Sequence, residues 1–186
     1  TLSCQQRLPL LASSLCREFV SATLVMHAGK PNLELLSWVM MPNHIHLILF
    51  GDLTPDSLAS FLAGFKSQTA RWVLPYLMSE APSLYQKCLD SQGRPRLWLR
   101  GGGYDRVLFS GEEIREKIAY IEANPVRRGL CKAPEDYNWS SAGDTEEMSS
   151  ADSLTTDARP ILPEGTMGRG WKLVNDPKTT DLLSLR

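Results

Sequence analysis

Two apolar runs that are separated only by Pro42 and Asn43 constrain the fold more than any other feature of this sequence. Residues 33–41 and 44–50 are rich in leucine, isoleucine, valine and methionine, and each has the length of an ordinary strand. Proline fixes its own φ angle and asparagine tolerates turn conformations, so the pair between the runs favours a tight turn. The sequence therefore predicts an antiparallel hairpin over residues 33–50.

The second strand of this hairpin carries two of the three histidines, His44 and His46. Successive side chains of a strand point to opposite faces, so both imidazoles share one face while Ile45 and Leu47 share the other. Imidazole is a common metal ligand, and one strand face would then supply two ligands to the same ion. A pair at this spacing also occurs as an ordinary part of a core or a sheet edge, and the spacing alone leaves both interpretations open.

Three segments show the spacing of apolar residues that is typical of amphipathic helices. Pro75 is the expected end of the second, because a proline lacks the N–H of the helical hydrogen bond. The third begins with Ser110 as N-cap and has Glu113 three residues later, the pattern of a capping box. The predicted helices cover residues 8–27, 58–74 and 110–124.

Shorter segments complete the predicted order of elements. Residues 97–99 and 106–109 are short strand candidates on either side of a glycine bend, and residues 79–95 are expected to form a connecting loop. The chain opens on Thr1 to Cys4 as if in the middle of a strand, so we expect further residues before Thr1. The order strand, helix, strand, strand, helix, strand, helix predicts an α+β fold, an antiparallel sheet with helices packed on one face.

The composition is that of a globular protein in water, with 42% hydrophobic and 22% charged residues. The longest apolar runs are too short to cross a bilayer, and no P-loop pattern predicts a nucleotide cofactor. The cysteines form no CxxC pair, which argues against a zinc knuckle or a disulfide framework and favours the reducing cytoplasm. They are Cys4, Cys16, Cys88 and Cys131.

The net charge of −1 conceals an uneven distribution of charged residues. Residues 94–132 contain nine bases and five acids, a net charge of +4, whereas residues 144–186 have a net charge of −3. The basic segment predicts contact with phosphate groups, although a mixed-charge solvated surface gives the same count. Residues 144–157 are rich in Ser, Thr, Asp and Glu, so we expect one domain over residues 1–143 and a polar linker with a C-terminal extension over 144–186.

Four stretches of the chain share their sequence with a known family. They are MPNHIHL at 41–47, LWLRGGGYDRVL at 97–108, EEIREKIAYIEANPVRRGL at 112–130 and DYNWSS at 136–141. Over roughly residues 1–142 the chain resembles the single-tyrosine HUH transposases (HUH for His-hydrophobic-His), and more narrowly the REP-associated tyrosine transposases. HIH alone is a weak motif, whereas HIH followed at this separation by YIEANPVRRGL is specific.

The resemblance implies a ferredoxin-like domain that cleaves and rejoins single-stranded DNA beside hairpins. His44 and His46 match the metal-ligand histidines of the family, and Tyr120 matches the nucleophile that forms a 5′-phosphotyrosine. Asn124 stands one helical turn later, where a third ligand of a divalent metal, Mg²⁺ or Mn²⁺, is expected. Insertion-sequence relatives usually have glutamine there, and an asparagine before Pro125 is also a common helix cap. Tyr120 taken without the family would be an amphipathic core tyrosine.

Contacts with DNA are predicted for six cations, and an unpaired base is expected to stack on Trp98 or Tyr104. The NPVRRGL segment resembles that of REP-associated members, which implies a monomer with its tyrosine acting in cis. Two alternatives stay open: a domesticated hairpin-binding protein that no longer transposes DNA, and a small-molecule metallo-hydrolase that uses the HxH pair. The predicted DNA-binding residues are Lys66, Arg71, Arg100, Arg106, Arg127 and Arg128.

Overall fold

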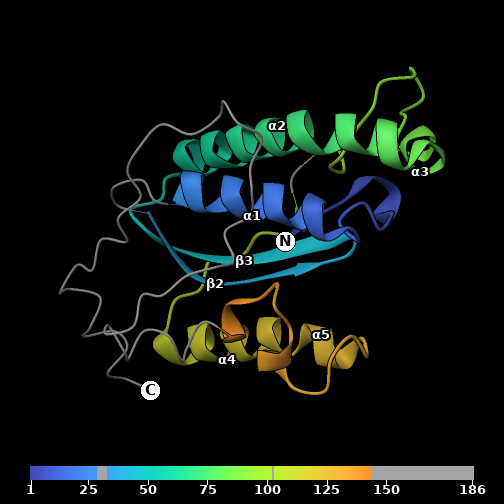
Figure 1. Cartoon of the computed structure of the whole chain (residues 1–186). Coiled ribbons are helices and arrows are strands. Elements are labelled where there is room, and N and C mark those ends of the chain that lie inside the picture. The colour runs from blue at the N-terminus through green and yellow to red at the C-terminus, as the bar shows by residue number, and fades with distance from the viewer. Residues whose placement is uncertain (29–32, 102, 144–186) are drawn as a thin grey trace, which may run out of the picture. The chain divides into compact units, whose positions relative to one another are not determined.

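The computed structural model describes residues 1–28, 33–101 and 103–143, and all structural statements concern these residues. The predicted extension over 144–186, with its linker, lies outside them. In the first half of the chain, a short strand and a helix precede a two-stranded hairpin, and a long helix follows it (Figure 1). Its elements are β1 (Leu2–Ser3), α1 (Ser14–Ala28), β2 (Leu33–Met41), β3 (His44–Gly51) and α2 (Pro55–Glu80).

The three strands form an antiparallel sheet in the order β1-β3-β2. The predicted hairpin is confirmed: Met41 pairs with His44 across the turn at residues 42–43, and Val39 pairs with His46. The predicted strand at residues 97–99 is a short antiparallel bridge beside β1, between Cys4 and Trp98. This bridge extends the sheet beyond β1 and gives the strand order of a ferredoxin-like domain. The predicted strand at 106–109 is wrong, because these residues lie in no described strand.

Helix α2 is longer than its apolar stripe predicts. It begins at Pro55, because Thr54 and Ser57 bond each other's backbone N–H groups as a capping box. It also continues past Pro75 to Glu80, which corrects the predicted end at residue 74. Pro75 itself is exposed, while Val73 and Leu77 on either side of it are buried. The burial of these side chains outweighs the hydrogen bond that the proline cannot donate.

Other helix boundaries also differ from the prediction. Helix α1 begins at Ser14 rather than at residue 8, because Leu10 and Leu11 are buried within the turn that precedes it. Residues 79–95 are not one loop, since they include α3 (Pro82–Lys87). The third predicted helix is confirmed as α4 (Gly111–Glu122), whose N-cap Ser110 accepts from the Glu113 N–H, and α5 (Asn124–Arg127) follows it.

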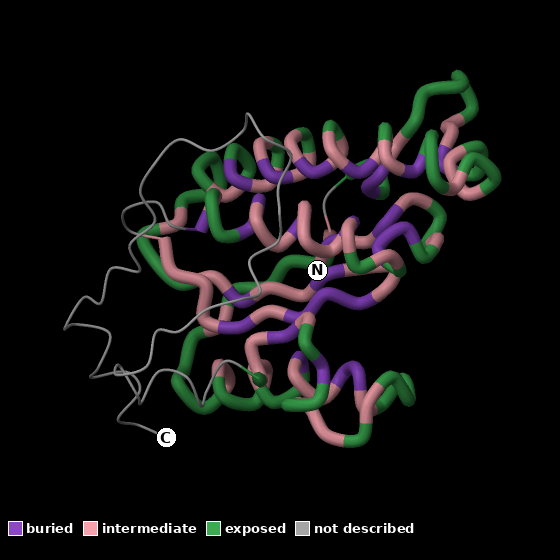
Figure 2. Tube along the Cα trace, in the orientation of Figure 1, coloured by how far each residue is buried: buried purple, intermediate pink, exposed green. Residues whose placement is uncertain are grey.

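Helices cover both faces of the sheet, which corrects the predicted packing on one face (Figure 1). Helices α1 and α2 lie on one side, as in a ferredoxin-like core, and α4 lies on the other. The physical reason is that both strand faces are apolar: Met40 and Ile45 belong to the core under α1 and α2, whereas Val39 and Met41 pack with Ile121 of α4. Figure 2 shows buried residues along the strands between these two layers.

The core under α1 and α2 includes a side chain that the sequence suggested for base stacking. Trp98 is buried there and donates its indole N–H to the Thr69 hydroxyl at 2.8 Å, so the prediction that it stacks a base is wrong. Thr69 in turn donates to the Phe65 carbonyl within α2. No helix in the described part of the chain is long and apolar enough to cross a membrane.

Candidate functional site

The histidine pair lies on the face of β3 that is turned toward α4. The rings of His44 and His46 are nearly perpendicular, with centroids 4.8 Å apart, while Ile45 is buried on the opposite face. His44 Nδ1 lies 2.6 Å from Asn43 Oδ1, and His46 Nδ1 lies 2.7 Å from Thr1 Oγ1. Both contacts engage Nδ1 and fix the ring, so Nε2 is the nitrogen that each ring can offer to a metal.

Burial keeps both imidazoles in their neutral form. It lowers the pKa of His46 to about 4, and the neighbouring His44 contributes next. Burial also lowers the pKa of His44, with Arg128 as the second cause. A neutral imidazole has a lone pair on one ring nitrogen, which is the form that binds a metal ion.

Tyr120 projects from α4 beside the histidine pair. Its ring centroid lies 6.4 Å from that of His46, and 48% of the residue is exposed, so it is no core tyrosine. Two cations flank the ring: the Arg127 guanidinium carbon lies 4.0 Å from the centroid and the Lys117 ammonium 5.2 Å. Arg127 also donates to the Tyr120 carbonyl at 2.9 Å, which ties the start of the NPVRRGL segment to this residue.

Asn124 is 8% exposed and holds the end of α4. Its side-chain N–H₂ donates to the Tyr120 carbonyl at 3.1 Å and to the Ile121 carbonyl at 3.3 Å. These bonds give Asn124 the capping role that the sequence left open. Neither bond uses its Oδ1, so its role as a metal ligand stays a prediction.

The donor set fits a divalent ion with few protein ligands. Among the residues that the structure describes, no group of three or more His, Cys, Asp or Glu side chains is placed to hold a metal. The site offers two neutral imidazoles, and the amide oxygen of Asn124 stays the predicted third donor. Such nitrogen and oxygen donors suit Mn²⁺, while Mg²⁺ prefers oxygen ligands alone.

The structure divides the six predicted DNA-binding residues among different places. Arg127 and Arg128 lie at the site, and Lys66 and Arg100 line a hollow beside residues 97–101. Arg71 lines another hollow, between α2 and His27 of α1. Arg106 forms an ion pair with Glu113, so its charge is already partly compensated.

A search against protein-family models and curated proteins gives no match for this chain. Among solved structures, a REP-associated tyrosine transposase bound to a REP hairpin is similar, with a TM-score of 0.58. The likeness covers 90% of each chain at 17% sequence identity. The fold is similar to that of a REP-associated tyrosine transposase. At this identity the likeness concerns the fold, and the roles of individual residues depend on the geometry described above.

The sequence gives no direct signal for two residues that complete the site. Thr1 bonds His46 through its hydroxyl, and its backbone nitrogen donates to the Tyr104 carbonyl at 2.7 Å. A Cβ on Gly103 would lie 1.6 Å from the Thr1 carbonyl oxygen, so only glycine allows this close approach. Lys117 is also absent from the predicted site, although its place three residues before Tyr120 puts both on one helix face.

Proposed function

We propose that this protein cleaves and rejoins single-stranded DNA through a covalent link to Tyr120, as a transposase of the single-tyrosine HUH type. The observation that carries the proposal is that Tyr120 lies beside His46 and that two cations, Lys117 and Arg127, lie against its ring. An exposed tyrosine next to two neutral imidazoles is expected for a nucleophile and has no evident packing function. The similar fold of a REP-associated tyrosine transposase supports the proposal.

The reaction needs one nucleophile and one phosphodiester. The Tyr120 hydroxyl loses its proton and its oxygen attacks phosphorus, the bond from phosphorus to the 3′ oxygen breaks, and that oxygen takes up a proton. The products are a 5′-phosphotyrosine and a free 3′-OH. The new ester retains the energy of the phosphodiester, so attack by another 3′-OH reverses the step and rejoins the strand without a nucleotide.

The remaining site residues hold the reacting groups in position or supply positive charge. Arg127 and Lys117 hold the Tyr120 ring, and both carry the positive charge that an approaching phosphate requires. Asn43 and Thr1 fix the two imidazoles through Nδ1. A divalent metal bound by His44, His46 and Asn124 would neutralise charge on the scissile phosphate and polarise phosphorus.

The nucleophile is tested by covalent trapping on a DNA hairpin with single-stranded flanks. Tyr120→Phe removes one hydroxyl from an exposed ring, so the fold should survive while the covalent adduct disappears from a denaturing gel. Tyr104→Phe is the matched control, because Tyr104 is also exposed, at 72%, and should form the adduct as the native chain does. An adduct that persists in Tyr120→Phe would contradict the assignment and make Tyr104 the next candidate.

The metal is tested through the histidines. We expect a chelator to stop cleavage and Mg²⁺ or Mn²⁺ to restore it in the native chain. His46→Ala should stay inactive after metal is added back. His27→Gln should remain active, since His27 lies beside Gln68 on α2 and belongs to no part of the site. Undiminished cleavage in excess chelator would rule out the metal.

The proposal includes catalysis within one chain. The contact between Tyr120 and His46 forms inside a single chain, which supports a monomer that acts in cis. A mixture of His46→Ala and Tyr120→Phe chains should therefore show no cleavage. Activity in the mixture would mean that two chains share their sites.

A further inference from the structure

A hollow of about 330 Å³ lies between α2 and residues 95–101, on the side of the sheet extended by the Cys4 and Trp98 bridge. Three cations line it: Lys66 from α2, and Arg96 and Arg100 from the opposite wall. No acidic residue is among the described residues that line it. The groove is thus a concave surface with one sign of charge, which favours a polyanion.

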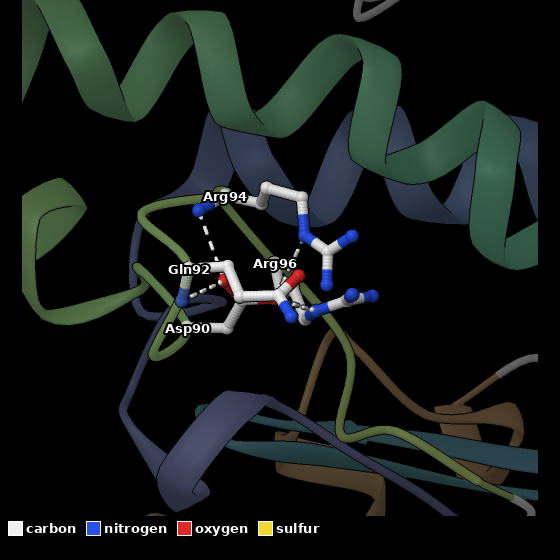
Figure 3. Close-up of polar contacts among 4 residues, drawn as sticks. All are labelled: Asp90, Gln92, Arg94 and Arg96. Atoms are coloured by element: carbon white, nitrogen blue, oxygen red, sulfur yellow. Dashed lines mark hydrogen bonds and ion pairs between the residues drawn. The ribbon is translucent and has the colours of Figure 1, made fainter.

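Arg96 is held in the wall of this groove by Asp90 (Figure 3). Its Nε donates to Asp90 Oδ2 at 2.8 Å, and the same oxygen accepts from Arg94 Nε at 3.2 Å. Asp90 Oδ1 accepts from the backbone N–H groups of Gln92 and Arg94. These bonds, with that from the Arg94 backbone as the largest cause, lower the pKa of Asp90, so it stays ionised. The Nε contact leaves the terminal nitrogens of Arg96 for a second anion.

Lys66 joins the two walls of the groove. Its ammonium donates to the Gly101 carbonyl at 3.0 Å and has two further protons for another acceptor. On the floor, the Trp98 indole is fixed by Thr69. The groove is therefore preorganised by hydrogen bonds, which reduces the entropy lost on binding.

Gly103 and Tyr104 are linked to His46 through Thr1. Gly103 packs against the Thr1 backbone, Thr1 donates to the Tyr104 carbonyl, and the Thr1 hydroxyl bonds His46. Two residues beyond Gly101 the chain thus reaches the neighbourhood of the proposed reaction centre. Tyr104 is exposed there, at 72%, beside this path.

We propose that the groove binds phosphate groups of the single-stranded DNA that leads away from the scissile phosphate, with an unpaired base stacked on Tyr104. The inference depends on the proposed function and assigns a strand path to it. A single strand is favoured over a duplex because the exposed aromatic ring can stack only on a base that has left its pair. Arg96, Lys66 and Arg100 contact the backbone, and Asp90 is a positioning residue for Arg96.

The test measures how DNA affinity depends on salt in the full chain. A fluorescent hairpin with single-stranded flanks is titrated by anisotropy over a range of salt concentrations, with a blunt hairpin as second probe. Each phosphate contact in a single strand contributes a slope of about 0.7 in log affinity against log salt. Arg96→Gln should reduce the slope for the flanked hairpin by about this amount, and Lys66→Gln and Arg100→Gln should do the same.

Arg94→Gln is the matched control, because Arg94 shares the Asp90 carboxylate but does not line the groove. Its slope should equal that of the native chain. Arg96→Lys keeps the charge without the Nε bond and should retain the native slope, which excludes misfolding as the cause of the Arg96→Gln effect. Tyr104→Leu should weaken binding of the flanked hairpin by about 5- to 100-fold and leave the slope unchanged.

Equal slopes for Arg94→Gln and Arg96→Gln would overturn the proposal. An equal loss of slope on the blunt hairpin would overturn it as well, because the groove would then hold a duplex. The proposed function fails by a separate measurement, since its failure is the absence of a Tyr120 adduct in the native chain. If the groove variants changed DNA binding while the native chain formed no adduct, the groove proposal would stand and the proposed nuclease activity would be excluded.

Discussion

The two faces of the sheet differ in how many side chains they bury and in which residues they carry. We call the face under α1 and α2 the thick face and the face under α4 the thin face. Under α1 and α2 sixteen buried residues form one hydrophobic cluster, whereas under α4 the buried cluster has five, so most of the folding energy belongs to the first face. The second face carries His44, His46 and Tyr120, which are only partly buried. We infer that the thick face is the rigid scaffold of the domain and that the thin face presents polar groups to a substrate.

Few side chains are buried on the thin face because α4 has a narrow apolar stripe. Ile121 is its only fully buried residue, and Ile118 packs partly against the same cluster. A wider stripe would draw Tyr120 into the sheet and cover the histidines. The C-terminal end of α4 is thus held by the burial of Ile121 and by the hydrogen bonds of Asn124, while Tyr120 on the same helix stays exposed.

The largest predicted effect is on the thick face. Phe65 is fully buried between α2 and the sheet, so Phe65→Ala should lower the free energy of unfolding by about 3–5 kcal/mol. Phe109→Ala is the control on an 88% exposed ring and should change it by less than about 0.5 kcal/mol. Urea unfolding measures both. Similar losses for the two variants would contradict the assignment of stability to the face under α1 and α2.

The thin face should dominate the pH dependence of stability in the metal-free protein. The pKa of His46 falls from 6.5 to about 4 on folding, so between these values the unfolded chain binds more protons than the folded one. Stability is therefore full above pH 6.5 and is lost as the pH falls toward 4, by up to about 1.4 kcal/mol per pH unit. Besides burial, the neighbouring imidazole of His44 and the guanidinium of Arg127 also lower the pKa of His46.

Urea unfolding at several pH values measures this dependence. His46→Gln cannot take up the proton, so its stability should vary less steeply between pH 6.5 and 4. An unchanged pH profile in His46→Gln would show that another group causes the acid sensitivity.

A third prediction concerns a single buried hydroxyl on the thick face. Thr69→Val keeps the shape but leaves the Trp98 indole N–H without its acceptor, which should cost about 1–3 kcal/mol of unfolding free energy. Thr69→Ser retains the hydroxyl and should lose clearly less. At saturating DNA and low temperature, adduct formation should persist in both variants, because Thr69 lies in the core under α1 and α2 and not beside His46 and Tyr120. If Thr69→Val were as stable as the native chain, the hydrogen bond would have no net value.

The hairpin and the histidine face could be predicted from the sequence because local chemistry decides them. The pair Pro42 and Asn43 favours a turn in any context, and alternation along a strand places His44 with His46. The Ser110 cap was equally local. The capping box that starts α2 also lies in the sequence, at Thr54 and Ser57, although serine stands where the usual pattern has Glu or Gln.

Tertiary packing decides the features that could not be predicted. Pro75 lies inside a helix because the buried residues around it continue the apolar face. Trp98 carries no sign in the sequence that its partner is Thr69, 29 residues earlier. The second helical layer could not be predicted, because the strand sequences alone do not show that both sheet faces are covered by helices. The contact of Thr1 with His46 joins residues 45 apart, and no local pattern marks it.

The smallest predicted effect separates two neighbouring arginines on the thin face. Both arginines are exposed, but Arg127 lies over the Tyr120 ring, 4.0 Å from its centroid, and donates to the Tyr120 carbonyl. A cation over an aromatic ring contributes about 0.5–2 kcal/mol. Arg127→Ala should therefore slow adduct formation at saturating DNA by about 2- to 30-fold. Arg128→Ala should leave that rate unchanged and reduce the salt slope of binding by about 0.7.

The substitution Arg127→Lys distinguishes ring positioning from charge alone. Lysine retains the positive charge but not the planar group that contacts both the ring and the Tyr120 carbonyl. Arg127→Lys should therefore have the salt slope of the native chain but a rate between those of Arg127→Ala and the native chain. Single-turnover kinetics at saturating DNA measures the rate without the affinity. If Arg127→Ala and Arg128→Ala changed rate and slope alike, both arginines would act as phosphate contacts and the orientation of Tyr120 would depend on α4 alone.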